Sequence, residues 1–270
     1  MPSEKELSQL VLADTATKLS GAASHRVVVS GSHGGRYPGY LAALAKVRAI
    51  ILCDAGIGKD EAGVAALADL NRLGIAAATA SHLSCRIGLA SDMIRRGVIS
   101  RTNELARALR VHVGDTCRES AIQLCAAPFN SCEPEPFGET RSDFRLGRRR
   151  VVLIDSAAMI LSSDRDAIVI TGSHGGLIGG DPAAALRADA FVVAFNDAGV
   201  GVEEAGVARL APLDVRGIAA FTVASASARI GEANSTYAEG VVSRVNQTAR
   251  RLGVREGDTA ASTVERLAEL

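Results

Sequence analysis

The sequence contains no tryptophan, only 3% aromatic residues and no apolar run long enough to cross a bilayer. Its first residues, 1–6, are polar and no apolar stretch follows them, so we expect neither a signal peptide nor a membrane span. The 30 basic and 30 acidic side chains cancel, and no net charge draws the chain to nucleic acid or to an anionic membrane. We therefore expect no nucleic-acid partner and no membrane partner.

Cysteine is scarce, odd in number and without any CxxC pair. The five cysteines are Cys53, Cys85, Cys117, Cys125 and Cys132. This pattern argues against a disulfide framework and against a structural zinc site. It predicts a reducing compartment, the cytoplasm.

The chain has 270 residues, enough for two domains, and it matches itself. From Asp54 to Thr116, a shift of 143 positions gives the same residue at more than half of the sites. Ahead of this stretch the shift is 141, and it pairs Asp14 with Asp155. The sequence therefore predicts a tandem duplication, with a first repeat at 1–125, a linker at 126–150 and a second repeat at 151–270.

Each repeat alternates short apolar runs with helical stretches. The predicted strands are 11–13, 26–30, 49–53 and 75–80 in the first repeat, and 151–154, 167–171, 191–196 and 218–224 in the second. Gly74 and Gly217 follow a helical stretch and should end it, and the last helix should open near Ser100 or Ser243. This order favours parallel strands with right-handed crossovers. We expect two Rossmann-like or flavodoxin-like three-layer α/β units with parallel sheets, related by a pseudo-twofold axis.

The predicted linker is rich in proline and polar residues and ends in the basic run 145–150. We interpret this run as a solvated stretch before the next strand, although its arginines could also bind a phosphate.

The motifs that the two repeats share all follow predicted strands. In the first repeat they are Asp14, 31–35, 54–58 and 84–88. In an open parallel sheet the ligand binds beyond the carboxyl ends of the strands, where these loops meet. We therefore expect one pocket in each repeat or a single pocket between them.

The sequence Gly-Ser-His-Gly-Gly occurs twice, at 31–35 and at 172–176. A loop of this kind can hold an oxyanion, carboxylate or phosphate with the amides of Gly34 and Gly35, while His33 acts as acid, base or ligand beside Ser32. The same would hold for His174 in the second copy. The alternative is a tight turn in which the histidine only binds the backbone.

This segment resembles the Gly-Ser-His-Gly turn of universal stress proteins, over the strand and the turn alone. In that family the backbone amides of the turn hold nucleotide phosphates. The resemblance implies a nucleotide- or anion-binding regulatory protein with two equivalent sites.

Carboxylates and arginines recur in the remaining loops. Asp54 and its counterpart Asp197 could orient a histidine or hold a polar ligand, with an Asx turn or a helix cap as the alternative. Arg86 and Arg229 could capture a substrate carboxylate, or Arg86 could form an ion pair with Asp54 or Glu61.

Reactive side chains are concentrated in the first repeat. Cys53, Lys59, His82 and Cys85 stand where the second repeat has Asn196, Val202, Ser225 and Ala228. Cys85 with His33 or His82 and with Asp54 would supply a nucleophile, a base and an orienting group. The alternative for Cys85 is a small buried residue.

These motifs favour a hydrolase that cleaves an amide, imide or lactone in a polar metabolite carrying a carboxylate. In this hypothesis the amides of Gly34 and Gly35 hold the oxyanion, His33 transfers the proton, Asp54 orients it and Arg86 binds the substrate's charge. If Cys85 is inert, His33 activates water. A two-base racemase or isomerase is a further hypothesis, and it requires His33 and His174 to face one cavity.

The other candidate binding residues are Asp14, Glu61, His82, His174, Asp197 and Arg229. We predict no cofactor, although His33, His174, Asp54 and Asp197 could bind a divalent metal ion without any HxxH or HExxH spacing to support it. The partner should be a small-molecule substrate, and the Ala- and Gly-rich helices indicate a homodimer.

Overall fold

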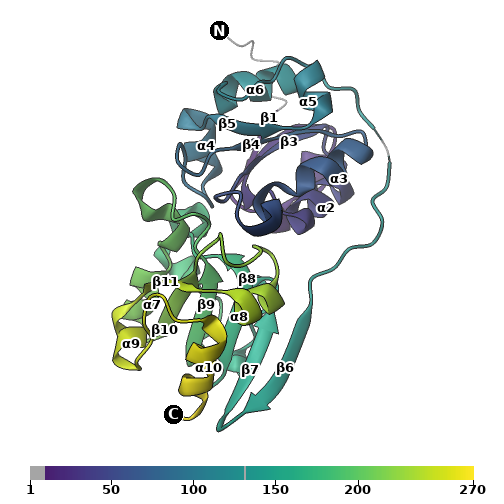
Figure 1. Cartoon of the computed structure of the whole chain (residues 1–270). Coiled ribbons are helices and arrows are strands. Elements are labelled where there is room, and N and C mark those ends of the chain that lie inside the picture. Colours follow the sequence, from purple (N-terminus) through teal and green to yellow (C-terminus); the bar gives the residue numbers. More distant parts are fainter. Residues whose placement is uncertain (1–9, 131) are drawn as a thin grey trace.

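The protein consists of two α/β halves, described by a computed structural model that covers residues 10–130 and 132–270 (Figure 1). Each half has one sheet with helices on both faces, which confirms the predicted fold class. Among the residues that the structure describes, no helix has the length and apolar character needed to cross a bilayer.

The first sheet has its strands in sequence order, and all pairs are parallel except the last, which is antiparallel. Its strands are β1 (Leu10–Ala13), β2 (Val27–His33), β3 (Ala49–Cys53), β4 (Ala76–Ala80) and β5 (Ile99–Thr102). The helices of this half are α2 (Arg36–Leu44), α3 (Ala66–Arg72), α4 (Ala90–Arg96), α5 (Glu104–Ala108) and α6 (Cys117–Leu124).

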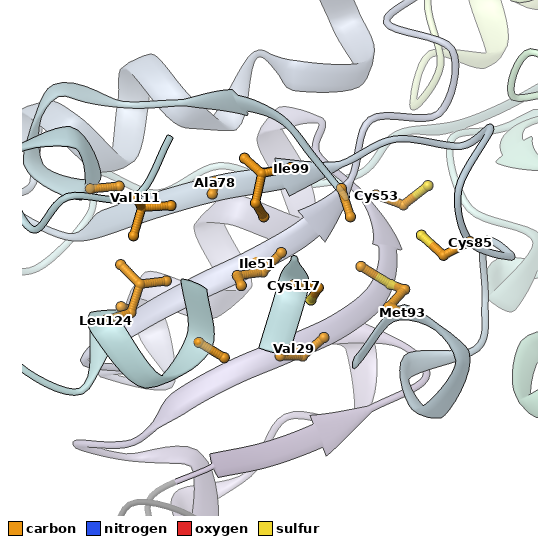
Figure 2. Close-up of a cluster of buried hydrophobic side chains, with 14 of the residues drawn as sticks. Val29, Ile51, Cys53, Ala78, Cys85, Met93, Ile99, Val111, Cys117 and Leu124 are labelled. Carbon is orange, nitrogen blue, oxygen red and sulfur yellow. The ribbon is translucent and has the colours of Figure 1, made fainter. Parts of the chain in front are cut away.

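Apolar side chains on both faces of this sheet produce the three layers, because successive residues of a strand point to opposite sides. Val29 and Ile51 pack into one core with residues of α4 and α6 (Figure 2). Val28 and Ile50 belong to the other core, which α2 and α3 cover. Both faces of the central strands are therefore buried.

The second half repeats this arrangement and adds one strand. Its strands are β6 (Arg141–Leu146), β7 (Arg149–Ile154), β8 (Ile168–His174), β9 (Val192–Asn196), β10 (Ala219–Val223) and β11 (Val242–Val245), in the order β11-β10-β9-β8-β7-β6. Its helices are α7 (Leu210–Val215), α8 (Ala233–Glu239), α9 (Gln247–Arg251) and α10 (Ala260–Ala268).

The added strand corrects the predicted linker. Residues 141–154 form the β6–β7 hairpin, with Arg141 opposite Ile154 and Leu146 opposite Arg149. The polar, arginine-rich sequence suits an exposed edge strand as well as it suits a linker. The connection between the halves therefore ends at β6.

The start of the last helix also differs from the prediction in both halves. Ser100 and Ser243 lie within β5 and β11. The N-caps are Asn103 and Asn246, whose side chains accept hydrogen bonds from the amides of Ala106 and Ala249. By contrast, Gly74 and Gly217 end their helices as predicted, with φ of 73° and 71°.

The carboxyl edges of the two sheets face each other, and reciprocal contacts join them. The amide of Lys59 donates to the Ser225 carbonyl at 2.8 Å, and the amide of Val202, the counterpart of Lys59, donates to the His82 carbonyl at 2.9 Å. Between these bonds Gly56 and Gly199 lie so close that a Cβ atom added to either one would be 2.8 Å from the Cα of the other. The loops after β3 and β9 thus cross at a pseudo-twofold axis.

Candidate functional site

A cavity of about 420 Å³ lies between the halves and contains both histidines of the repeated pentapeptide. The ring centroids of His33 and His174 are 6.4 Å apart. Both halves and the connecting segment line this cavity, and its polar residues include Ser32, Ser173, Glu139 and Arg209. The two repeats therefore share one pocket.

Backbone amides determine the tautomers of the two imidazoles. The amide of Gly35 donates to Nδ1 of His33, and the amide of Gly176 donates to Nδ1 of His174, both at 3.1 Å. A nitrogen that accepts a hydrogen bond carries no proton, so the neutral ring carries its hydrogen on Nε2. Each neutral imidazole therefore has one remaining polar group, an Nε2–H donor.

The environment keeps both rings neutral near pH 7. Burial lowers the pKa of His33 to about 4. Burial also lowers the pKa of His174 well below its ordinary value, and the positive charge of Arg209 and the neighbouring His33 add to this effect. Neutral imidazoles of this kind polarise a carbonyl oxygen by donating to it. They do not serve as bases through Nε2.

A carboxyl group with a raised pKa lines the same cavity. Burial raises the pKa of Glu139 to about 7, with a further contribution from the charge of Asp155, while hydrogen bonding to Ser156 and Tyr37 opposes the increase. A carboxyl group with a pKa near 7 can both accept and release a proton at physiological pH. Glu139 is therefore the candidate general base, and it comes from the segment that the sequence assigned to the linker.

A buried arginine lines the cavity as well. Arg209 is only 4% exposed. Its Nε donates to the Gly176 carbonyl at 2.9 Å and its Nη1 donates to the Ala185 carbonyl at 2.8 Å. Burial lowers the pKa of Arg209 to about 10, so the guanidinium remains charged at pH 7. The cavity thus contains a cation as well as a titratable acid.

The predicted oxyanion donors have other partners. The amide of Gly34 donates to the Cys53 carbonyl at 2.7 Å, and that of Gly35 donates to His33. Ser32 accepts a hydrogen bond from the amide of Ala16 at 2.9 Å. The prediction that the two glycine amides hold an oxyanion is therefore wrong, because the turn uses both of them for its own structure.

Asp54 contacts His82 and not His33. Its Oδ1 accepts from the ring Nδ1 of His82 at 2.8 Å and from the amides of His82 and Gly56. Although burial raises the pKa of Asp54, the hydrogen bonds from His82 outweigh it and lower that pKa. Asp197 accepts from the amides of Gly199 and Ser225 in the same way. Both aspartates therefore stabilise turns, and the predicted His33–Asp54 pair does not form.

Cys85 lies in the apolar core, apart from the cavity lining (Figure 2). Its thiol is fully buried and donates to the Ser81 carbonyl at 3.4 Å. Burial raises the pKa of this thiol to about 12. A nucleophilic cysteine needs a thiolate, so the geometry supports the alternative prediction of a small buried residue.

The two recurring arginines connect the halves. Arg86 Nε donates to Glu203 at 2.9 Å, and Arg229 Nη1 donates to Asp60, the counterpart of Glu203, at 2.9 Å. Neither arginine lines the cavity. They form ion pairs as in our second interpretation, but with the opposite repeat and not with Asp54 or Glu61.

The last two candidates lie outside the cavity lining. Asp14 accepts a hydrogen bond from the amide of Ala90 at 2.8 Å and so stabilises the start of α4. Glu61 is exposed, with a left-handed backbone at φ 54°.

Across residues 10–130 and 132–270 there is also no cluster of three or more His, Cys, Asp or Glu side chains that could hold a metal ion.

Sequence reasoning missed Glu139 and Arg209. Arg209 stands where the first repeat has Ala66, and the comparison of the halves could have identified this difference. Glu139 has no counterpart in the comparison, because it lies in the segment between the repeats. From sequence alone, a charged residue beside proline and glycine is expected to be exposed. Its place in the cavity wall follows only from the tertiary structure.

Comparison with protein-family models, with curated proteins and with solved structures finds no match for this chain.

Proposed function

We propose that this protein is a small-molecule enzyme that hydrolyses an amide, imide or lactone bond in the cavity between its halves. One observation carries the proposal: two neutral imidazoles and a carboxyl group with a pKa near 7 line the same cavity. Groups with perturbed pKa values that gather in one cavity are typical of active sites. The volume of about 420 Å³ suits a small metabolite.

In the proposed mechanism the substrate carbonyl oxygen accepts hydrogen bonds from Nε2–H of His33 and His174. Ionised Glu139 takes a proton from water, and the water oxygen forms a bond to the carbonyl carbon. The two imidazoles stabilise the resulting oxyanion. The C–N or C–O bond then breaks, and Glu139 returns its proton to the leaving nitrogen or oxygen.

This assignment replaces three roles that the sequence suggested. Water takes the place of Cys85 as nucleophile, the imidazoles take the place of the glycine amides as oxyanion donors, and Glu139 takes the place of His33 as base. Each replacement follows from a contact or a pKa described above. The mechanism uses residues of this chain alone.

The test is a screen of carboxylate-bearing amides, imides and lactones, followed by kinetics of variants on any substrate that is hydrolysed. Glu139→Gln should lower kcat by about 100-fold or more, the usual contribution of a general base. Cys85→Ala should retain the parental kcat. An unchanged kcat in Glu139→Gln, or the loss of activity in Cys85→Ala with its fold intact, would disprove the mechanism.

A second candidate is an isomerase or racemase, since the two imidazoles do share one cavity. Their Nδ1 atoms are engaged by backbone amides, so the imidazoles would not be the two bases. Glu139 would instead remove and return the proton beside a carbonyl whose enolate the imidazoles stabilise. Deuterium incorporation from D₂O into a substrate that is not hydrolysed would identify this reaction.

The nucleotide-binding alternative lacks the free amides that it needs, because those of Gly34 and Gly35 donate within the protein. Calorimetry with ATP, ADP and phosphate tests it directly.

A small-molecule substrate, no nucleic-acid partner, a homodimer and the cytoplasm remain our predictions for partner and compartment.

A further inference from the structure

We propose that Arg209 is the specificity-determining residue of the cavity and that it binds the carboxylate of the ligand. This inference depends on the proposed function in one respect, namely that the cavity is the active site. It concerns the binding of the ligand and not its turnover.

The guanidinium of Arg209 is buried without a counterion. Within the part of the chain that the structure describes, no carboxylate forms an ion pair with it, and its two hydrogen-bond partners are the uncharged carbonyls of Gly176 and Ala185. An unpaired buried charge costs several kcal/mol. Two of the five guanidinium N–H groups are used, which leaves three donors for a ligand. An anion in the cavity would supply the missing charge.

The surroundings of Arg209 favour an anion further. His174 is close enough for the Arg209 charge to lower its pKa. Its Nε2–H is an additional donor for a carboxylate oxygen. Lys18 and Arg187 are exposed residues on the wall of the same cavity. Their positive charges would attract an anionic ligand toward the opening.

The cavity is symmetric in its backbone but not in its charge. The histidines and serines pair across the pseudo-twofold axis, whereas the counterpart of Arg209 is Ala66. Glu139 and Tyr37 lie close to each other on the cavity wall. A ligand therefore has one favoured orientation, with its carboxylate at Arg209 and its reacting carbonyl toward Glu139. The substrate class that fits is a small carboxylate with a second carbonyl group.

The experiment measures binding of acetate, succinate, glutarate, neutral succinamide and inorganic phosphate by calorimetry. Succinate or glutarate should bind the parent protein, and succinamide should bind much more weakly. Arg209→Met should weaken carboxylate binding by about 30-fold, which corresponds to the loss of one charge-assisted hydrogen bond of about 2 kcal/mol. Arg209→Lys should restore part of the affinity.

The matched control is Arg216→Met. Arg216 lies at the other end of α7, does not line the cavity, and bonds to Asp189 and to the Leu186 carbonyl. This variant should bind carboxylates like the parent. Circular dichroism verifies the fold of each variant, and if Arg209→Met does not fold, the comparison of succinate with succinamide on the parent protein decides the question.

Equal carboxylate binding by Arg209→Met and the parent would overturn the proposal. So would equal binding of succinate and succinamide, binding of phosphate without binding of carboxylates, or binding of none of these compounds at millimolar concentration. The two proposals fail in different ways. If the parent protein binds carboxylates but hydrolyses no compound in the screen, the enzyme mechanism is contradicted and the Arg209 site remains supported.

Discussion

The imidazoles of His33 and His174 meet at the pseudo-twofold axis with their ring centroids 6.4 Å apart and their planes at 80°, although 141 positions separate them in the chain. Each ring accepts a hydrogen bond from the second residue after it. Two copies of one pentapeptide therefore present a pair of matched donors to one cavity.

The first prediction concerns the protonation of these rings. The pKa of His33, about 4 in the folded protein and 6.5 ordinarily, should leave its ring neutral down to about pH 5, with the hydrogen on Nε2. NMR of the ¹⁵N-labelled imidazoles reports both features. A His33 ring that titrates near pH 6.5, or that carries its hydrogen on Nδ1, would contradict the assignment.

The same shift makes stability depend on pH. Below pH 6.5 the histidine binds a proton in the unfolded chain, whereas in the folded protein His33 binds one only near pH 4. The free energy of unfolding therefore decreases as the pH falls from 6.5 to 4. His33→Gln should make the decline of Tm between pH 6.5 and pH 4 shallower. Thermal unfolding of both proteins across this range measures the difference, and parallel curves would refute it.

Glu139 should have the opposite dependence. Its pKa is about 7 in the fold and 4.5 ordinarily, so the folded state holds a proton that the unfolded chain has lost, and stability falls as the pH rises from 4.5 through 7. Glu139→Gln should therefore be about 1–2 kcal/mol more stable than the parent at pH 8 and nearly equal to it at pH 4. Denaturant unfolding at the two pH values tests this. A variant that is less stable at pH 8 would show that the ionised carboxylate is held favourably.

Removal of the Arg209 charge should change His174. Burial is the largest cause of the lowered pKa of His174, and Arg209 is the next. Arg209→Met should thus raise the pKa of His174 while leaving it below the ordinary value. The ¹⁵N titration that reports on His33 also measures this shift. An unchanged His174 titration would mean that the guanidinium does not act on the ring.

The thiol of Cys85 should be inert. With a pKa of about 12, it contains almost no thiolate at pH 8, whereas Cys132 is exposed. Iodoacetamide should alkylate Cys132 and leave Cys85 unmodified in the folded protein, as peptide mass spectrometry can show. Rapid alkylation of Cys85 in the folded state would reopen its role as nucleophile.

The crossing of the halves should be sensitive to one methyl group. A Cβ atom on Gly56 would lie 2.8 Å from the Cα of Gly199, and Gly56 has φ of 77°. Gly217 has φ of 71° with nothing within 4 Å of such an atom. Gly217→Ala should cost about 1 kcal/mol from backbone strain alone, and Gly56→Ala about 1–3 kcal/mol more from the overlap. Equal costs in denaturant unfolding would show that the halves can separate at this point.

Local sequence determined most of the secondary structure. The apolar runs that precede the pentapeptides form the first part of β2 and β8, which continue to His33 and His174. Gly74 and Gly217 end their helices with a left-handed backbone, because burial and φ preferences act over a few residues. Where two local signals compete, the prediction was wrong. Ser100 is a good N-cap by type, but it lies in β5, and the cap is Asn103 three residues later.

The self-comparison placed the shared motifs at one edge of each sheet, and the tertiary structure decided which of them meet. Because the two edges face each other, Arg86 and Arg229 form ion pairs between the halves, and the two histidines line one cavity. Asp54 pairs with His82 within the first half. These pairings depend on contacts between residues far apart in the chain, which no local pattern encodes.

The sequence alone therefore predicted two similar halves, the central strands of each sheet and the two histidines of the candidate site, but not the edge strands β5, β6 and β11. Only the tertiary structure selected Glu139 and Arg209, because the chemistry of both depends on burial. In the folded chain burial brings the pKa of a glutamate in a polar segment near 7, and an arginine at the start of a helix becomes a buried cation.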